Sequence, residues 1–134
     1  MNIEFDEKSI QEFQDKLKTV EKKAPDRIID KLDDEGKKLR VAMRKNTPKI
    51  TGKLSKGYRL TPVEKARGGY EKGLYNKAPH HHLVNNGHRK VTPGGRVIGW
   101  TPGLFYIEKT VGEQEGPMMN ELQNWLDNLF EELK

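Results

Sequence analysis

The sequence predicts an α+β domain in which long helices pack on an antiparallel sheet of three to five strands. Near both ends of the chain, apolar residues recur every three or four positions, a spacing typical of amphipathic helices. The middle stretch from Leu74 to Leu104 instead holds short apolar runs, two Pro-Gly pairs and all four histidines. Because 134 residues is the usual size of one domain, residues 1–134 are expected to form a single unit.

Two helices are expected in the N-terminal part. The first begins at Ser9, where a glutamate three residues later completes a capping box. Before it, the alternation of Ile3 and Phe5 predicts a short edge strand. The second helix begins at Pro25, since proline suits the first turn, where its missing amide proton has no partner. It ends at Asn46-Thr47-Pro48, because the residue before a proline avoids the α region.

The last helix is expected after a break at Gly116-Pro117. Five apolar residues then recur at helical spacing and form one stripe. They are Met118, Leu122, Trp125, Leu129 and Leu133. The chain therefore has a long N-terminal helical region and a C-terminal amphipathic helix, both packed on the sheet.

The centre of the chain is expected to contain loops and strands. Residues 47–57 are polar and basic and are predicted to form a mobile loop. Strands are expected at 58–63 and 70–76. Apolar residues flank Thr92-Pro93-Gly94-Gly95, which predicts a hairpin over about 89–100.

Charge is distributed unevenly along the chain. Residues 1–36 carry net −4, residues 37–72 net +10, residues 73–110 net +4 and residues 111–134 net −5, which gives +5 overall. A basic centre between acidic ends indicates a nucleic-acid surface or a polarised subunit whose neighbours dock positive face to negative face. The simpler alternative is that the lysines only solvate the surface.

Composition excludes several classes of protein. There are no cysteines, so the sequence indicates neither a disulfide scaffold nor a thiolate metal site. No apolar run is long enough to span a membrane, and the N-terminus lacks a signal-peptide pattern, which predicts a chain made and folded in the cytoplasm. With 33% hydrophobic and 34% charged residues, we expect a thin core or surfaces that are hidden in an assembly.

The four histidines are candidate metal ligands. If 79–84 is extended, His80 and His82 share one face, and His88 could return toward them. However, the stretch 74–101 contains no Asp, Glu or Cys to complete a site, so no metal or other cofactor is expected. With only two serines, one a helix cap and one in a basic loop, and no thiol, the chain is predicted to be non-enzymatic.

Binding of nucleic acid is the alternative function. Several basic residues alternate with aromatic ones and could track phosphates and stack on bases. They are Lys49, Lys53, Lys56, Arg59, Lys65, Arg67 and Lys72, interleaved with Tyr58 and Tyr70. No zinc-finger, RNA-recognition or clear helix-turn-helix pattern accompanies them.

Three motifs carry a resemblance to a known family. The first motif is Thr51-Gly52-Lys53-Leu54, which follows a basic helix. The second is the stretch 75–88, which reads Y-N-K-A-P-H-H-H-L-V-N-N-G-H. The third runs from Val97 to Gly103 and ends in Pro-Gly, before a helix with Phe105 near its start. In this order the chain resembles the small head–tail joining, or tail-completion, proteins of long-tailed bacteriophages and prophages. It departs from the family pattern at His81, where alanine is usual, and at Asn85, where glutamate is usual.

The resemblance implies an α+β virion protein, without enzymatic activity, that joins a ring in the neck between head and tail. It implies contacts with other neck or tail proteins, possible non-specific contact with packaged DNA, and no membrane. The signature residues are Tyr75, Asn76, Pro79, His82, Leu83, Gly87, Pro102 and Gly103. The residues expected to face partners or DNA are Lys49, Lys53, Lys56, Arg59, His88, Arg89, Lys90 and Arg96.

Overall fold

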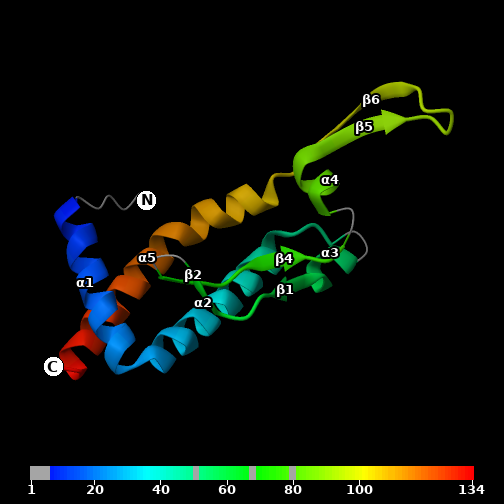
Figure 1. Ribbon diagram of the computed structural model, residues 1–134. Coiled ribbons are helices and arrows are strands. Elements are labelled where there is room, and N and C mark those ends of the chain that lie inside the picture. Colours follow the sequence, from blue (N-terminus) through cyan, green and yellow to red (C-terminus); the bar gives the residue numbers. More distant parts are fainter. Residues whose placement is uncertain (1–6, 50–51, 67–68, 79–80) are drawn as a thin grey trace.

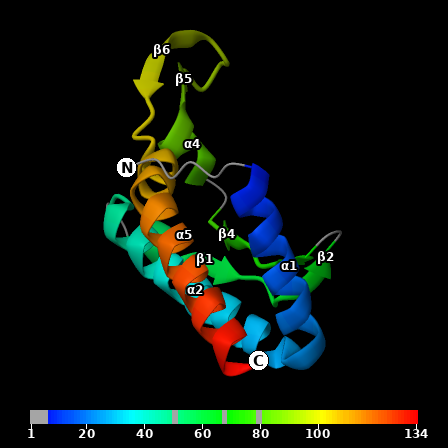
Figure 2. The same cartoon turned by 90° about the vertical axis from the view of Figure 1, so that its left-hand side faces the viewer.

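Three long helices make up the body of the protein: α1 (Glu7–Lys23), α2 (Pro25–Asn46) and α5 (Tyr106–Glu132). The computed structural model describes residues 7–49, 52–66, 69–78 and 81–134 (Figure 1). α2 and α5 run antiparallel, and α1 packs beside both of them (Figure 2). The main core forms where the three helices meet and buries Val20, Ile28, Leu126 and Leu129. Each such side chain contributes roughly 1.5–3 kcal/mol when fully buried.

A second, smaller core lies toward the other end of α2 and α5. It buries Met43, Tyr58 and Tyr106, with Val84 and Ile107 packed against them. These residues come from both long helices and from the segments between them. The second core therefore fixes the middle of the chain onto the helical body.

The strands pair two by two and are all antiparallel. β1 (Tyr58–Leu60) pairs with β4 (Leu74–Asn76), and β2 (Glu64–Ala66) pairs with β3 (Gly69–Glu71). These two pairs are the halves of one long, interrupted hairpin, bridged by the Thr61 N–H, which donates to the Gly73 carbonyl at 2.8 Å. β5 and β6 form a separate hairpin with strands Gly87–Val91 and Val97–Pro102.

A single sheet of three to five strands is therefore not what the described residues form. The expected antiparallel pairing is present, and so is the predicted hairpin near residues 89–100. The pairs stay separate because β5 and β6 leave the body on the short helix α4 (His81–Asn86) and point away from the other strands (Figure 1). The long helices consequently pack mainly on one another.

The prediction of a helix break at Gly116-Pro117 is wrong, because α5 is continuous through Pro117. An interior proline removes one helical hydrogen bond and costs about 3 kcal/mol. The helix persists because both of its halves are anchored: Tyr106 lies in the second core and Leu126 in the first.

Two predictions at the N-terminal end also need correction or go untested. α1 begins at Glu7, so Ser9 lies inside the first turn and is not the residue that precedes the helix. The proposed edge strand with Ile3 and Phe5 falls outside the described residues. α2, by contrast, begins at Pro25 and ends at Asn46, as predicted.

Part of residues 47–57, the segment predicted to be a mobile loop, is helical: Lys53–Lys56 form one turn, α3, with Leu54 buried. The turn begins after Gly52, whose φ of 77° suits glycine. It is held by the Arg44 guanidinium, which donates from Nε to the Ser55 carbonyl at 3.0 Å. Positions 50–51 lie outside the described residues.

The extended conformation under which the histidines of 79–84 could share a face is not formed where the chain is described. His81 and His82 begin α4, and in a helix successive side chains point about 100° apart. The helix is favoured because its last carbonyls are satisfied: the N–H groups of Leu104 and Phe105 donate to Val84 and Asn85 at 3.0 Å. Pro79 and His80 lie outside the described residues.

Candidate interaction surfaces

Charge is separated along the length of the molecule. The last ten residues of α2 hold five basic and no acidic side chains, and they lead to α3 and the β5–β6 hairpin at one end (Figure 1). The second half of α5, at the other end, holds four acidic residues and no basic one. These are Glu121, Asp127, Glu131 and Glu132. The uneven charge of the sequence therefore becomes a polarity of the folded chain.

The first group of predicted interface residues surrounds the C-terminal end of α2. Lys49, Lys53 and Lys56 are exposed there. Lys49 and Lys56 line an open hollow of about 580 Å³, together with Arg44 and Lys45. Arg59 has a structural role nearby, since its guanidinium donates to the carbonyls of Lys56 and Tyr58 at 2.8 and 2.9 Å.

The second group lies on the β5–β6 hairpin, which we call the arm (residues 87–102). Arg89, Lys90 and Arg96 are exposed on it. His88 belongs to β5, but its side chain lies outside the description. The turn is fixed by Thr92, whose hydroxyl oxygen accepts the Arg96 N–H at 3.1 Å. Both basic groups thus lie at one end of the molecule, on separate elements.

The arm also exposes large apolar side chains. Val97, Ile98 and Trp100 are 54%, 59% and 57% exposed, and Leu104 and Phe105 beyond it are similarly open. An isolated two-stranded hairpin is only marginally stable in water. It is less stable still when its apolar side chains face solvent. The arm therefore has the character of a surface that is completed by another chain.

The base of the arm is built from closely packed backbone. Gly87 has a φ of 88°, and a Cβ there would lie 2.7 Å from the Thr101 carbonyl oxygen. A Cβ on Gly103 would lie 2.4 Å from the Asn85 carbonyl oxygen. These two signature glycines let α4, the arm and α5 meet at one point. Pro102, the register partner of Gly87, is exposed.

Asn85 joins α4 to the start of α5. Its side chain is buried, and its Oδ1 accepts the Ile107 N–H at 2.9 Å, which satisfies a free amide of the first helical turn. Its Nδ2 donates to both carboxylate oxygens of Glu108 at 3.1 and 3.2 Å. A glutamate, the residue usual at this position in the family that the chain resembles, has a carboxylate that could not donate in this way. Asparagine in place of glutamate at position 85 therefore fits the presence of Glu108, which needs a donor.

Most other signature residues have plain structural positions. Asn76 is buried, donates from Nδ2 to the Leu54 carbonyl at 2.7 Å and accepts the Ala78 N–H at 2.8 Å, which fixes α3 against β4. Tyr75 and Leu83 are 53% and 41% exposed, and His82 is exposed too. The sequence motif therefore combines residues that hold the fold with residues that remain available at the surface.

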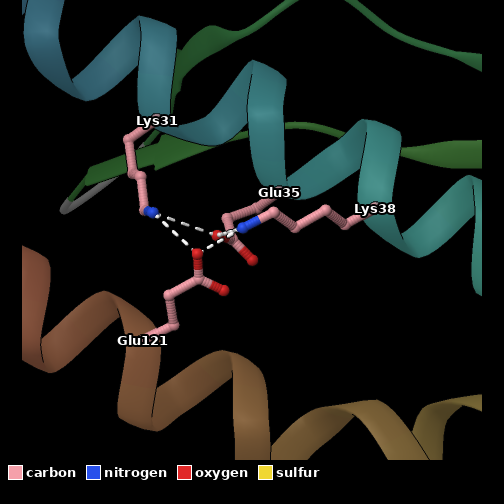
Figure 3. Close-up of polar contacts among 4 residues, drawn as sticks. All are labelled: Lys31, Glu35, Lys38 and Glu121. Atoms are coloured by element: carbon pink, nitrogen blue, oxygen red, sulfur yellow. Dashed lines mark hydrogen bonds and ion pairs between the residues drawn. The ribbon is translucent and has the colours of Figure 1, made fainter.

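A network of charges clamps α2 to α5 (Figure 3). Lys31 lies 3.2 Å from Glu35 and 3.1 Å from Glu121, and Lys38 bonds to the same two carboxylates. Glu35 is 4% exposed, so its charge needs these partners. Hydrogen bonds from Lys38 and Lys31 lower the pKa of Glu121 to about 2. Sequence reasoning missed this network, although Glu35 occupies a position of the apolar stripe of α2.

A chain of hydroxyl groups runs through the second core. Thr47 donates to the Met43 carbonyl at 2.6 Å and lies 2.7 Å from the Tyr58 hydroxyl, which is therefore the donor between them. Tyr106 donates to the His81 carbonyl at 2.9 Å. Burial and the neighbouring Tyr58 raise the pKa of Tyr106 to about 12. Tyr106 is thus held neutral and links α5 to α4, while Tyr58 links β1 to the end of α2.

Within the described residues, no three His, Asp or Glu side chains gather where they could hold a metal ion. His80 and the side chain of His88 lie outside this description. The Ser55 hydroxyl donates to the Gly52 carbonyl at 3.2 Å, which is a local turn contact. No helix in the described part of the chain is both long and apolar enough to cross a membrane.

Fold and surfaces together define a small α+β protein with a polarised body and an arm that carries exposed apolar groups. Residues 11–87 match the HK97-gp10-like family, described as "Bacteriophage HK97-gp10, putative tail-component". The match covers more than half of the chain, and the chain belongs to this family. It is a structural protein of the bacteriophage tail type. Neither a curated protein nor a solved structure matches it.

Proposed function

We propose that this chain is a non-enzymatic structural protein of the head–tail connection, where it assembles into a ring and completes the join between filled head and tail. Its partners are copies of itself and other neck or tail proteins, and its location is the virion, after synthesis in the bacterial cytoplasm. The observation that carries this proposal is the arm, whose exposed Val97, Ile98 and Trp100 lie beside basic residues. The family of tail components supports the general class.

The polarity of the molecule favours assembly from like subunits. Copies in a closed ring make heterologous contacts, in which two different patches of each subunit complement one another. This chain offers a basic end with an arm and an acidic α5. Non-specific contact between the basic end and packaged DNA is compatible with a place next to the filled head.

Labelling of purified virions tests this location. Antibodies against the chain, coupled to gold and viewed by electron microscopy, should mark the junction between head and tail. Virions from a strain with an epitope-tagged copy provide a matched second probe. Label at the distal tip, or along the tail tube, would contradict the proposal.

A second candidate function is binding of nucleic acid by the basic end. It is favoured by the gathering of Arg44, Lys45, Lys49 and Lys56 around one open hollow. Cations placed in this way can contact phosphates without reading sequence. The arm's exposed apolar side chains have no role in this function.

Salt dependence of DNA retention separates the two functions. A nucleic-acid-binding protein should retain DNA strongly at low salt and lose it steeply as salt rises, with each phosphate contact adding about 0.9 to the slope. The triple variant Lys49→Gln, Lys53→Gln and Lys56→Gln should then lose affinity for DNA. Arg59 is not substituted in this variant, because its guanidinium holds two backbone carbonyls. The joining function predicts weak retention by both proteins at physiological salt.

A further inference from the structure

We infer that the arm of one copy docks on the outer face of helix α5 of a second copy. This inference rests on the proposed ring assembly and names the two surfaces that meet in it. Both surfaces lie almost wholly beyond residues 11–87, the part of the chain that matches the family. They are defined by the contacts and exposures of this chain alone.

One face of the arm combines apolar groups with a cation. Ile98 lies two residues before Trp100 on β6, at a β-bulge where Val97 and Ile98 together oppose Val91, and this keeps Ile98 on the side of the arm that carries Trp100. Arg89 is the direct partner of Trp100 in the antiparallel register, which puts the guanidinium on that same face. All three side chains are exposed. There is no Asp or Glu from position 72 to position 107, so nothing on the arm neutralises its charge.

The complementary surface is a strip on α5 formed by Glu108, Val111, Gly112 and Glu115, the α5 strip. All four residues are exposed, and their spacing of three and four puts them on one side of the helix. Val111 is 48% exposed between the two carboxylates. Glu115 has no ion-pair partner within the described residues. A Cβ added to Gly112 meets no atom within 4 Å, so the strip is open at its centre.

Comparison with other exposed apolar residues favours this strip. Val41 is 65% exposed, but it lies on α2 among lysines and arginines that would repel the arm. Ile10 lies on α1, where basic side chains slightly outnumber acidic ones in the described range. Val111 lies on the first half of α5, which holds Glu108, Glu113 and Glu115 against a single lysine, Lys109. Opposite charges around apolar groups are the complementarity that fixes register between two chains.

The contact must form between copies. In both views the arm extends away from α5, so it cannot fold back onto the α5 strip of its own chain (Figures 1 and 2). The arm and the strip are different patches on one subunit. Repeating this contact from copy to copy generates a ring if the rotation closes.

The absence of cysteine from the sequence makes disulfide trapping a clean test. A chain with Ile98→Cys is mixed with a differently tagged chain with Val111→Cys and oxidised. Docking should give at least about tenfold more mixed disulfide than a control pair of Ile98→Cys and Val41→Cys, because it raises the local concentration of the two thiols. Both partner positions are exposed, so folding is not at risk. Equal yields in the two pairs would overturn the inference.

Charge exchange provides the second measurement. Arg89→Glu and Glu115→Arg should each weaken self-association, measured by sedimentation, by about tenfold or more, because like charges then face each other. The double variant restores opposite charges and should recover association. If it does not recover, or if neither single variant weakens association, the inference is wrong.

These outcomes are distinct from those that test the proposed function. Gold label at the neck without trapping between Ile98→Cys and Val111→Cys would mean that the arm binds another neck protein, and only the inference would fail. Trapping with label at the tail tip would leave the docking intact and contradict the proposed location.

Discussion

Asn85 shows how one side chain can join three segments of the chain. Its amide accepts from the Ile107 N–H and donates to Glu108, while its own carbonyl accepts the Phe105 N–H. A buried amide that uses both of its ends cannot be replaced without leaving a polar group unpaired. The base of the arm and the start of α5 therefore depend on this residue.

Asn85→Asp should destabilise the protein at neutral pH by about 1–3 kcal/mol. The substitution keeps the acceptor for the Ile107 N–H but puts a carboxylate against Glu108. Urea unfolding followed by circular dichroism measures the loss. Adding Glu108→Gln should recover part of it, whereas Asn120→Asp, at an exposed position of α5, should have little effect. A stable Asn85→Asp protein would contradict the role of the amide.

Gly103→Ala should disturb the base of the arm, because the added Cβ would lie 2.4 Å from a backbone oxygen that cannot move alone. Such overpacking costs about 1–3 kcal/mol. Gly94→Ala in the hairpin turn is the matched control, since its Cβ meets nothing closer than 3.9 Å. Thermal unfolding should separate the two variants, and equal melting temperatures would count against the close packing.

At the scale of elements, the charge network that clamps α2 to α5 makes the free energy of unfolding depend on pH. The pKa of Glu121 falls from its ordinary value of 4.5 to about 2 in the folded chain. Its contribution is therefore complete above pH 4.5 and is lost as pH falls toward 2. Because the Glu121 side chain is 40% exposed, solvent screens the pairs, and we expect the loss to be only about 1 kcal/mol.

The free energy of unfolding, measured in urea at several pH values, should decrease between pH 5 and pH 2, and Glu121→Gln should reduce that slope. Glu115→Gln on the same helix is the control, since Glu115 has no ion pair within the described residues. If the two variants show the same dependence on pH, the clamp does not contribute as described.

Core and arm should respond differently to the removal of a large side chain. Leu126→Ala should cost about 2–5 kcal/mol, because this side chain is fully buried between the helices. Trp100→Ala should change the stability of the free subunit by about 1 kcal/mol or less, since more than half of the side chain faces solvent. Denaturant titration of both variants checks this contrast. A Trp100→Ala loss as large as that of Leu126→Ala would show that the arm is part of the core.

The elements differ in how far the sequence predicts them. The start of α2 follows from a proline at its first turn, and the β5–β6 turn follows from the sequence Thr-Pro-Gly-Gly. The bounds of α2 and the presence of the hairpin are confirmed. The continuity of α5 does not follow from local chemistry, because packing at both ends of the helix outweighs the local cost of Pro117. α4 was missed for a similar reason, since its carbonyls are satisfied by residues about 20 positions away.

The candidate site was predictable in part. The basic residues of α3 and the arm were identified from the sequence, and the structure exposes most of them. The exposure of Ile98 and Trp100 was not predictable, because a strand pattern does not reveal whether its apolar face is covered. The α5 strip was missed as well, since Val111 reads as one more apolar helix residue until the fold shows it on the surface.

At the scale of the whole molecule, the uneven charge of the sequence becomes a separation along the long axis (Figure 1). The single sheet expected from the strand patterns is replaced by separate pairs, since pairing between distant strands depends on where the connecting elements lead. The result is a helical body with a projecting arm. Such a shape suits contact with neighbours on more than one side.

Deletion of the gene from its phage or prophage tests the central claim, that the chain joins head to tail, most directly. Electron microscopy of the induced lysate should show DNA-filled heads and separate tails, and a plasmid copy should restore tailed, infectious particles. The same plasmid carrying Asn120→Asp, at an exposed position of α5, serves as a folded control. Tailed, infectious particles in the absence of the gene would contradict the account.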